Sequence, residues 1–291
     1  MQISLPTAAQ GLPGMPSGNG GYEGHGLRKL SRALLAQAFA LAMVLPAMAP
    51  AAEYEPAVGQ EGKDVIWVPT PQPLVEKMLD IAKVTPRDYL IDLGSGDGRT
   101  VITAARRGLR AHGIEYNPDM ADLARRNAKQ AGLADRATFA TADLFETDLT
   151  QAHVITMFLL PEINAKLRPR ILDLKPGTRV VSNSFRMGDW EPDGAASVSE
   201  DCQNWCTAFL WIVPAKVQGT WRLGNQELRL TQRFQMLSGT LGAHAISEAR
   251  MAGNTISFTV NGARYTGTVD GKTITGSVVS GRSGAWSATR T

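Results

Sequence analysis

The sequence predicts a doubly wound α/β domain with a parallel sheet, followed by a small antiparallel all-β domain. Strand-like and helix-like segments alternate between residues 71 and 213, and a glycine-rich loop joins the first strand to a helix. Short alternating runs separated by turn dipeptides follow residue 217. We therefore divide the chain into a leader over 1–51, an α/β domain over 52–214 and a β-meander domain over 217–291.

The α/β elements have lengths typical of a parallel sheet covered by helices. Apolar residues recur at a helical period over 71–83, so a helix precedes the first strand. We expect strands at 88–93, 110–115, 137–142, 153–158, 179–183 and 207–213, and helices at 99–107, 118–131 and 161–173. Pro118 suits the first turn of its helix, where no N–H is needed. A ligand is expected at the carboxyl ends of the strands.

The segment after residue 217 alternates apolar and polar residues in short runs, such as Ser257–Val260. Gly253-Asn254, Asn261-Gly262 and Asp270-Gly271 lie between such runs, and dipeptides of this kind form tight hairpin turns. The pattern predicts an antiparallel meander that curls into a small sheet or barrel. No acid–base constellation is evident in it, so we expect a stabilising or partner-binding role.

The loop after the first strand carries most of the functional information. Its residues are Asp92, Gly94, Ser95, Gly96, Asp97 and Gly98. Alternate glycines let the backbone turn tightly and approach a ligand at the start of a helix. About 20 residues later the second strand ends in Glu115, a spacing that suits a carboxylate accepting hydrogen bonds from two ribose hydroxyls. The sequence therefore predicts an adenosine site, in which we include the adjacent Tyr116.

The charge of this loop separates the candidate nucleotides. A dinucleotide site prefers G-x-G-x-x-G beneath a pyrophosphate, whereas this loop reads D-x-G-x-G-x-G. The carboxylates of Asp92 and Asp97 disfavour a pyrophosphate and favour a cationic ligand. S-adenosylmethionine carries a sulfonium and an ammonium group, so we expect it as the cofactor. A dinucleotide oxidoreductase is the least fitting enzyme class.

Composition excludes some partners. The chain has 30 Lys and Arg against 27 Asp and Glu, a net charge of +3 that is too small to indicate a nucleic-acid partner. Its two cysteines, Cys202 and Cys206, have no accompanying histidines and make a poor metal site, so we expect no metal. They are either free thiols or one local disulfide, depending on the compartment.

The leader bears on localisation. Residues 1–27 are rich in Gly, Pro and Ser, which predicts disorder. Basic residues at 28, 29 and 32 precede an uncharged apolar run over 33–48, and small residues follow at 49–51. This is the layout of a secretory signal peptide. It predicts export to the periplasm or anchoring at the inner membrane through 33–48; a buried helix in a cytoplasmic protein is the alternative.

Methyl transfer from a sulfonium is an in-line displacement, for which a protein mainly positions the acceptor. The acceptor site should lie just past the fourth strand, where the chain reads Phe158-Leu-Leu-Pro161. This apolar loop, ended by Pro161, offers backbone carbonyls and an aromatic wall to an amine packed on Phe158. A strand that simply ends at Pro161 is the local alternative.

Five segments together resemble one family, the bacterial class I methyltransferases related to the mitochondrial lysine methyltransferase that modifies the c subunit of ATP synthase. The segments are Val65–Pro71, Asp92–Arg99, Phe158–Pro161, Lys166–Pro169 and Met187–Trp190. The resemblance covers about 62–213 and implies a Rossmann-like sheet and N-methylation of a protein lysine. It also implies that Asp143, after the third strand, receives the adenine amine, with Leu144 or Phe145 against the ring.

An acceptor lysine has to lose its proton, and an apolar environment lowers its pKa. We expect Trp67, Phe158 and Trp190 as walls of the acceptor site and Asp189 as a group that orients the amine. Where such relatives tend to have His-Asp after the fifth strand, this chain has Asn183-Ser184. Other amines, small-molecule acceptors and a non-catalytic exported binding protein therefore stay open as alternatives.

Overall fold

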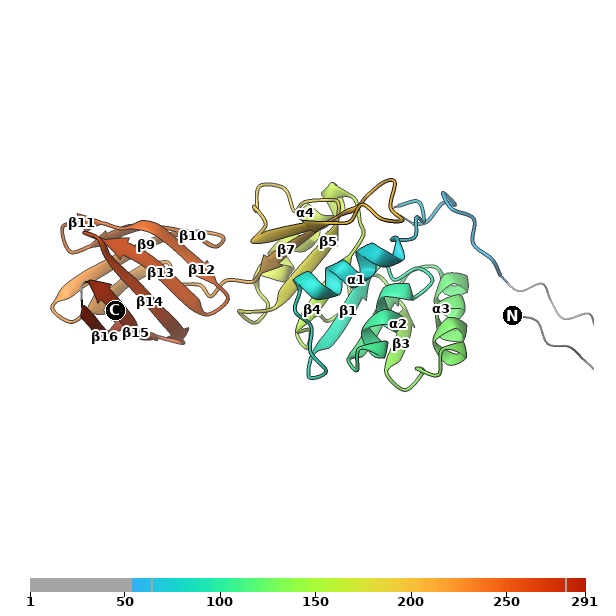
Figure 1. The fold of residues 1–291 in the computed structure, drawn as a ribbon, viewed down its shortest axis with the longest axis horizontal. Coiled ribbons are helices and arrows are strands. Elements are labelled where there is room, and N and C mark those ends of the chain that lie inside the picture. The colour runs from blue at the N-terminus through green and yellow to red at the C-terminus, as the bar shows by residue number, and fades with distance from the viewer. Residues whose placement is uncertain (1–53, 64, 281) are drawn as a thin grey trace, which may run out of the picture. The chain divides into compact units, whose positions relative to one another are not determined.

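The computed structural model describes residues 54–63, 65–280 and 282–291. The predicted signal segment at 28–51 lies outside the described residues. Within the described ranges, none of the helices has the length and apolar character needed to cross a membrane. Two separate sheets organise the described part, a mixed sheet of seven strands and an antiparallel sheet of nine (Figure 1).

The seven-stranded sheet has the strand order β3-β2-β1-β4-β5-β7-β6. Its strands are β1 (Tyr89–Leu93), β2 (Arg110–Glu115), β3 (Ala137–Thr141), β4 (Val154–Met157), β5 (Arg179–Asn183), β6 (Gly194–Ser197) and β7 (Thr207–Ile212). Strands β1 to β5 are parallel, and β7 and β6 complete the sheet in antiparallel pairings. The strand order reverses between β1 and β4, and the carboxyl ends of such strands border the ligand crevice of doubly wound folds.

Helices cover both faces of this sheet because successive strand residues point to opposite sides. The helices are α1 (Gln72–Ile81), α2 (Arg99–Arg106), α3 (Pro118–Gln130) and α4 (Pro161–Leu172). Leu90 packs in a core cluster with residues of α1, α2 and α3, and its neighbour Ile91 packs in a second cluster with residues of α4. The doubly wound fold predicted from the sequence is therefore confirmed, including every predicted strand and helix.

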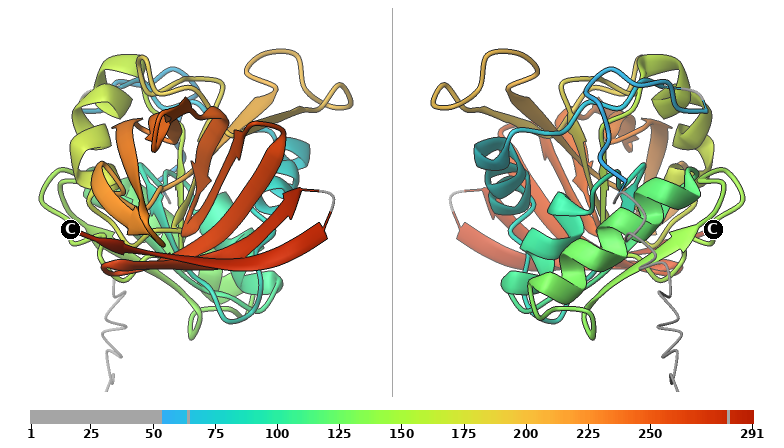
Figure 2. Two further views of the ribbon diagram at one scale, coloured as in Figure 1. Left: turned by 90° about the vertical axis from the view of Figure 1, so that its left-hand side faces the viewer. Right: turned by 90° about the vertical axis from the view of Figure 1, so that its right-hand side faces the viewer.

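The second sheet closes on itself. Its strands are β8 (Gly219–Leu223), β9 (Gln226–Arg233), β10 (Met236–Leu241), β11 (His244–Ala245), β12 (Ser247–Ala252), β13 (Thr255–Val260), β14 (Ala263–Asp270), β15 (Thr273–Ser280) and β16 (Arg282–Arg290). All neighbouring strands are antiparallel. Pairings of β9 with β10 and of β16 with β8 close the sheet into a ring, and the short β11 pairs with β10 outside this ring (Figure 2). Trp221, Phe258 and Trp286 are buried in its core. The predicted meander is confirmed as a barrel.

Candidate active site

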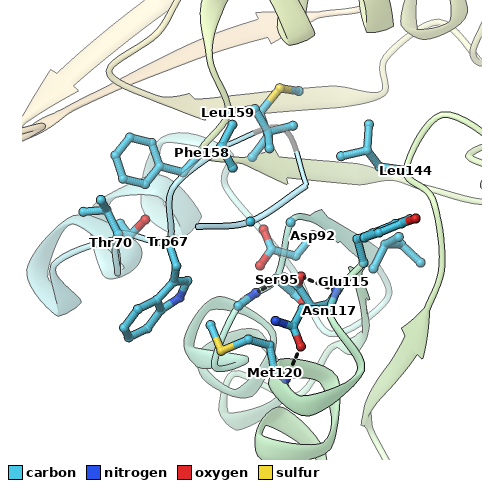
Figure 3. A pocket seen from close by; sticks show the side chains of 18 of the residues that line it. Trp67, Thr70, Asp92, Ser95, Glu115, Asn117, Met120, Leu144, Phe158 and Leu159 are labelled. Atoms are coloured by element: carbon cyan, nitrogen blue, oxygen red, sulfur yellow. Dashed lines mark hydrogen bonds between the residues drawn. The ribbon is translucent and has the colours of Figure 1, made fainter. Parts of the chain in front are cut away.

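A cavity of about 670 Å³ opens at the carboxyl ends of β1, β2 and β4. Residues 60–63 and 65–70, which precede α1, form one wall, and the glycine loop and the loop after β4 form others. Figure 3 shows Asp92, Ser95 and Glu115 close together inside it, with Phe158 and Leu159 on the loop after β4. A cavity of this size is large enough for a nucleotide-sized ligand.

The glycine loop leaves its backbone bare toward the cavity. Gly96 has a φ of +53°, and a Cβ added there would lie 2.6 Å from Nε1 of Trp67. Gly98 has a φ of +83°, and its Cβ would lie 2.7 Å from the ring of Phe139. Both positions therefore need glycine for conformation and for space. Gly94 and Gly96 line the cavity. Gly98 instead caps the start of α2 and does not line the cavity, so the prediction that it contacts the cofactor is wrong.

Glu115, at the end of β2, is held by two backbone donors. The N–H of Gly96 donates to its Oε2 at 2.9 Å, and the N–H of Asn117 donates to its Oε1 at 3.0 Å. The Asn117 side chain in turn caps the start of α3. Each carboxylate oxygen keeps lone pairs for a further donor. The geometry is therefore suited to a pair of ribose hydroxyls.

Asp92 lies at the floor of the cavity and is only 6% exposed. Burial raises the pKa of its carboxyl to about 7; the hydroxyl of Thr156, which donates to Oδ1 at 2.6 Å, opposes this rise, and the nearby Glu115 and Asp97 charges add to it. Ser95 Oγ is also buried and has no hydrogen-bond partner among the described residues. A buried carboxyl and a buried hydroxyl of this kind call for a polar, cationic ligand group.

Asp97 lines the cavity, but its charge is already paired. The guanidinium of Arg99 donates to both carboxylate oxygens, with a shortest distance of 2.6 Å, and also to the carbonyl of Thr70 at 2.9 Å. Arg99 therefore ties the glycine loop to the segment before α1. Arg99 was not predicted as a site residue, although its place two residues after Asp97 is a signal for a local ion pair.

At the adenine end predicted from the sequence, Asp143 and Leu144 line the cavity together with Tyr116. Lys63 Nζ lies 2.6 Å from Asp143 Oδ2 and 4.4 Å from the centre of the Tyr116 ring. The hydrogen bond from Lys63 holds the pKa of Asp143 below its usual value. Of the two candidates for the ring contact, Leu144 lines the cavity, whereas Phe145 packs against a core cluster. Lys63, 80 residues away in sequence, carries no local signal.

Three aromatic rings gather where the acceptor was expected. The rings of Phe158 and Phe185 stack with centres 6.0 Å apart, and the ring of Trp205 is tilted to that of Phe158 with centres also 6.0 Å apart. All three line the cavity. Cys202 and Cys206 form a disulfide around Trp205, which resolves the alternative left open by the sequence. Neither Phe185 nor Trp205 was predicted, because their segments have no recognisable motif.

Other acceptor predictions are wrong. Trp190 is fully buried, stacks against Phe234, and donates from Nε1 to Oε1 of Gln235 at 2.9 Å. Asp189 pairs with Arg168 and Arg233. Neither residue lines the cavity, because both are occupied by contacts with the β9–β10 hairpin and α4.

The structure places Pro161 and Trp67, two further residues predicted for the acceptor site, apart from the aromatic cluster. Pro161 begins α4 and does not line the cavity, although Leu160 before it and Ile163 after it do. Trp67 lines the cavity as predicted, but its indole lies against Gly96 of the glycine loop. Phe158 is thus the predicted acceptor wall residue that the structure places with the aromatic cluster.

Comparisons with known proteins agree with this geometry. A family model described as the ANTKMT methyltransferase domain matches residues 92–194. A protein-lysine N-methyltransferase of Saccharolobus islandicus is 41% identical over 152 residues, which cover 51% of this chain and 94% of that relative. The chain belongs to the same methyltransferase family as this relative. The methyltransferase resembles further relatives over shorter shares of their length.

An adenine nucleotide translocase lysine N-methyltransferase of Mus musculus is 38% identical over 120 residues, covering 40% of this chain and 52% of the relative. A lysine N-methyltransferase of the same species, named for the c subunit of ATP synthase, is 34% identical over 128 residues, covering 44% and 51%. The chain thus spans about half the length of these two relatives. A solved RNA methyltransferase from Salinibacter ruber, in complex with S-adenosyl-L-homocysteine, is 49% identical, with 52% of this chain and 96% of that chain covered and a TM-score of 0.48.

S-adenosylmethionine is the cofactor of this family member, and the cavity fits it. The bare backbone at Gly94 and Gly96 admits close approach, Glu115 has lone pairs for the ribose, and the buried Asp92 carboxyl suits an ammonium group. No cluster of three or more potential metal ligands was found within 54–63, 65–280 and 282–291. The protein is therefore a methyltransferase, and the cavity beside the glycine loop and β2 has groups suited to its cofactor.

Proposed function

We propose that the methyltransferase acts on the side-chain amine of lysine in a protein. The observation that carries the proposal is that one cavity holds both the cofactor residues, such as Gly96 and Glu115, and the aromatic rings of Phe158, Phe185 and Trp205. The names of three relatives, which are lysine N-methyltransferases, support the same acceptor. An aromatic wall suits a long alkyl amine better than a phosphate-rich acceptor.

S-adenosylmethionine, when bound, supplies an electrophilic methyl group on its sulfonium. The carbon–sulfur bond breaks as the nitrogen–carbon bond forms, and the sulfur leaves as a neutral thioether that needs no general acid. The protein's part is to present an uncharged amine in line with that bond. Apolar surroundings at Phe158, Phe185 and Leu160 disfavour the charged ammonium and lower its pKa. Leu160 and Trp205 are exposed at the rim, so the released proton can pass to water.

The test is a labelling experiment with the full chain. We expect methyl-labelled S-adenosylmethionine to label host proteins, with the label on the Nε atom of lysine by peptide mass spectrometry. Asp92→Asn is the matched control, because it removes the buried charge while preserving side-chain size. Label found only in RNA or in small amines would overturn the lysine proposal.

We also propose that the segment 28–51 directs export, so that the protein is released into the periplasm or stays anchored at the inner membrane. The sequence layout of this segment supports it, and the Cys202–Cys206 disulfide is consistent with it because disulfides persist in oxidising compartments. The intact mass and N-terminus of the protein from fractionated cells test the proposal. Cleavage near Ala51 in the periplasmic fraction is expected, and a full-length, reduced chain in the cytoplasm would contradict it.

A further inference from the structure

The segment between β6 and β7 carries an aromatic side chain to the rim of the cavity. Trp205 has a φ of +55°, a conformation that bulky residues rarely adopt. The disulfide from Cys202 to Cys206 closes a short loop around it. Such a conformation persists where the surrounding structure restrains it, and the covalent ring supplies that restraint.

Trp205 is not needed to fill a core. The residue is 43% exposed, although it lines the cavity and the centre of its ring lies 6.0 Å from that of Phe158. Phe158 stacks in turn on Phe185 at 6.0 Å. The three rings come from separate segments, after β4, after β5 and before β7, which meet at this side of the cavity. A half-exposed indole beside two stacked rings offers π faces to a ligand.

The carboxylates that line the cavity lie on other segments. Asp92, Asp97 and Glu115 belong to the cofactor loop and β2, Glu61 lies on the segment before α1, and Asp143 pairs with Lys63. Among the described residues, the segments that bear the three rings contribute no carboxylate to the lining. At the half-exposed Trp205 an ammonium ion is therefore attracted by the indole face, the most strongly attracting of the aromatic rings, before it reaches the more apolar surroundings of Phe158.

We propose that Trp205, held by the Cys202–Cys206 disulfide, is the residue that recognises the protonated acceptor amine and determines acceptor specificity. The proposal rests on the proposed lysine methylation and adds a recognition step to it. The ammonium first binds the indole face and then passes toward Phe158, where its proton is lost. Anionic and hydroxyl acceptors gain nothing from this contact and are disfavoured.

A bisubstrate probe tests the proposal without knowledge of the natural acceptor. The probe is a cofactor analogue in which a nitrogen atom replaces the sulfonium and bears a four-carbon ammonium arm; S-adenosylhomocysteine is the reference. Calorimetry gives the ratio of the two affinities. We expect Trp205→Ala to lower this preference for the arm about fivefold without changing the affinity for S-adenosylhomocysteine.

Two further variants separate the cation–π contact from simple apolar cover. Trp205→Phe keeps a ring and should retain most of the preference, whereas Trp205→Leu keeps apolar area only and should behave like Trp205→Ala. Met236→Ala, on β10 and also exposed, is the matched control and should leave the preference unchanged. Equal preference in wild type and Trp205→Ala would overturn the proposal.

Reduction tests the role of the disulfide, because the chain has only two cysteines and a reductant acts on this one bond. Reduced wild type and the Cys202→Ser/Cys206→Ser variant should lose the preference to the same extent as Trp205→Ala. Reduction of Trp205→Ala should have no further effect, since the disulfide acts through Trp205. A reductant effect that persists in Trp205→Ala would contradict this role. Failure of wild type to bind S-adenosylhomocysteine would instead overturn the cofactor site and the proposed function.

Discussion

Asp92 combines burial with a functional charge. The residue is 6% exposed, its carboxyl accepts a hydrogen bond from Thr156, and the pKa of this carboxyl is raised to about 7 mainly by burial. Near neutral pH the protonated and charged forms are therefore both populated. A ligand ammonium group shifts this balance toward the charged form, which couples ligand binding to proton release.

This coupling predicts that cofactor affinity depends on pH. Below about pH 7 a proton has to leave Asp92 on binding, so the affinity for S-adenosylhomocysteine should fall by about tenfold per pH unit and should be level above pH 7. Calorimetry between about pH 5 and pH 8, in buffers of different ionisation enthalpy, measures both the affinity and the released proton. Asp92→Asn should bind weakly at every pH. An unchanged slope in this variant would assign the proton to another group.

The same carboxyl predicts an opposite effect on the stability of the ligand-free protein. Its folded pKa of about 7 lies above the model value of 3.8, so between these values the folded state holds a proton that the unfolded state has lost. The free energy of unfolding contributed by Asp92 therefore falls as pH rises through this window. Asp92→Asn should remove that fall, so it should be the more stable protein above pH 7. Thermal unfolding of wild type and Asp92→Asn across this pH range measures the difference between their stabilities. The effects of other carboxyls cancel in this difference.

At the residue scale, the sequence predicted the groups that belong to one continuous motif. Asp92, the loop glycines and Glu115 lie within one strand–loop–helix–strand unit, whose spacing alone brings them together. Lys63 and Trp205 reach the site through contacts between distant segments. Trp190 shows the converse, because a tryptophan beside a turn has the same sequence pattern whether it lines a site or fills a core.

At the scale of elements, periodicity predicted the α/β units well because their faces are consistently apolar. Strand β6 was missed because Gly194–Ser197 contains only small residues. Strand β12 was missed because Ser247–Ala252 includes helix-forming Glu, Ala, Arg and Met. Strand β10 contains Gly239, which weakens a strand pattern. Their pairing partners, which lie outside any local window, stabilise these three strands.

Gly239 yields a prediction about the barrel. A Cβ at this position would lie 1.8 Å from the carbonyl oxygen of Arg229 on β9, so Gly239→Ala has to displace backbone. We expect a loss of about 3 kcal/mol in the free energy of unfolding. Gly262→Ala is the matched control: Gly262 also has a positive φ, of +77°, but open space around it, so its loss should be about 1 kcal/mol. Thermal or denaturant unfolding measures both, and equal losses would show that the clash is relieved.

At the scale of the whole molecule, the segment Met187–Trp190 joins the α/β domain to the barrel. Besides the bond from Trp190 to Gln235, Gln235 Nε2 donates to the carbonyl of Glu191 at 2.7 Å. Arg233 of β9 lies 2.7 Å from Asp189. Met187–Trp190, one of the segments that resemble the family, therefore stabilises the contact between the α/β domain and the barrel. The boundaries at 51, 214 and 217 stay predictions.

This attachment predicts a loss of stability in Gln235→Ala. The substitution leaves the buried Nε1 of Trp190 without its acceptor, which costs about 1–3 kcal/mol. Affinity for S-adenosylhomocysteine should be unchanged, because Gln235 does not line the cavity. Thermal unfolding and calorimetry test the two statements separately. The exposed Gln226 on β9 provides the control, since Gln226→Ala should change neither quantity.

The ion pair between Lys63 and Asp143 has a consequence for turnover. It joins the segment before α1 to the loop after β3 at 2.6 Å, with 36% and 28% of the two side chains exposed. Dissolved salt screens such a pair. The residence time of the spent cofactor should therefore shorten as ionic strength rises. The rate of product release, rather than the rate of methyl transfer, should then change with the salt concentration of the compartment.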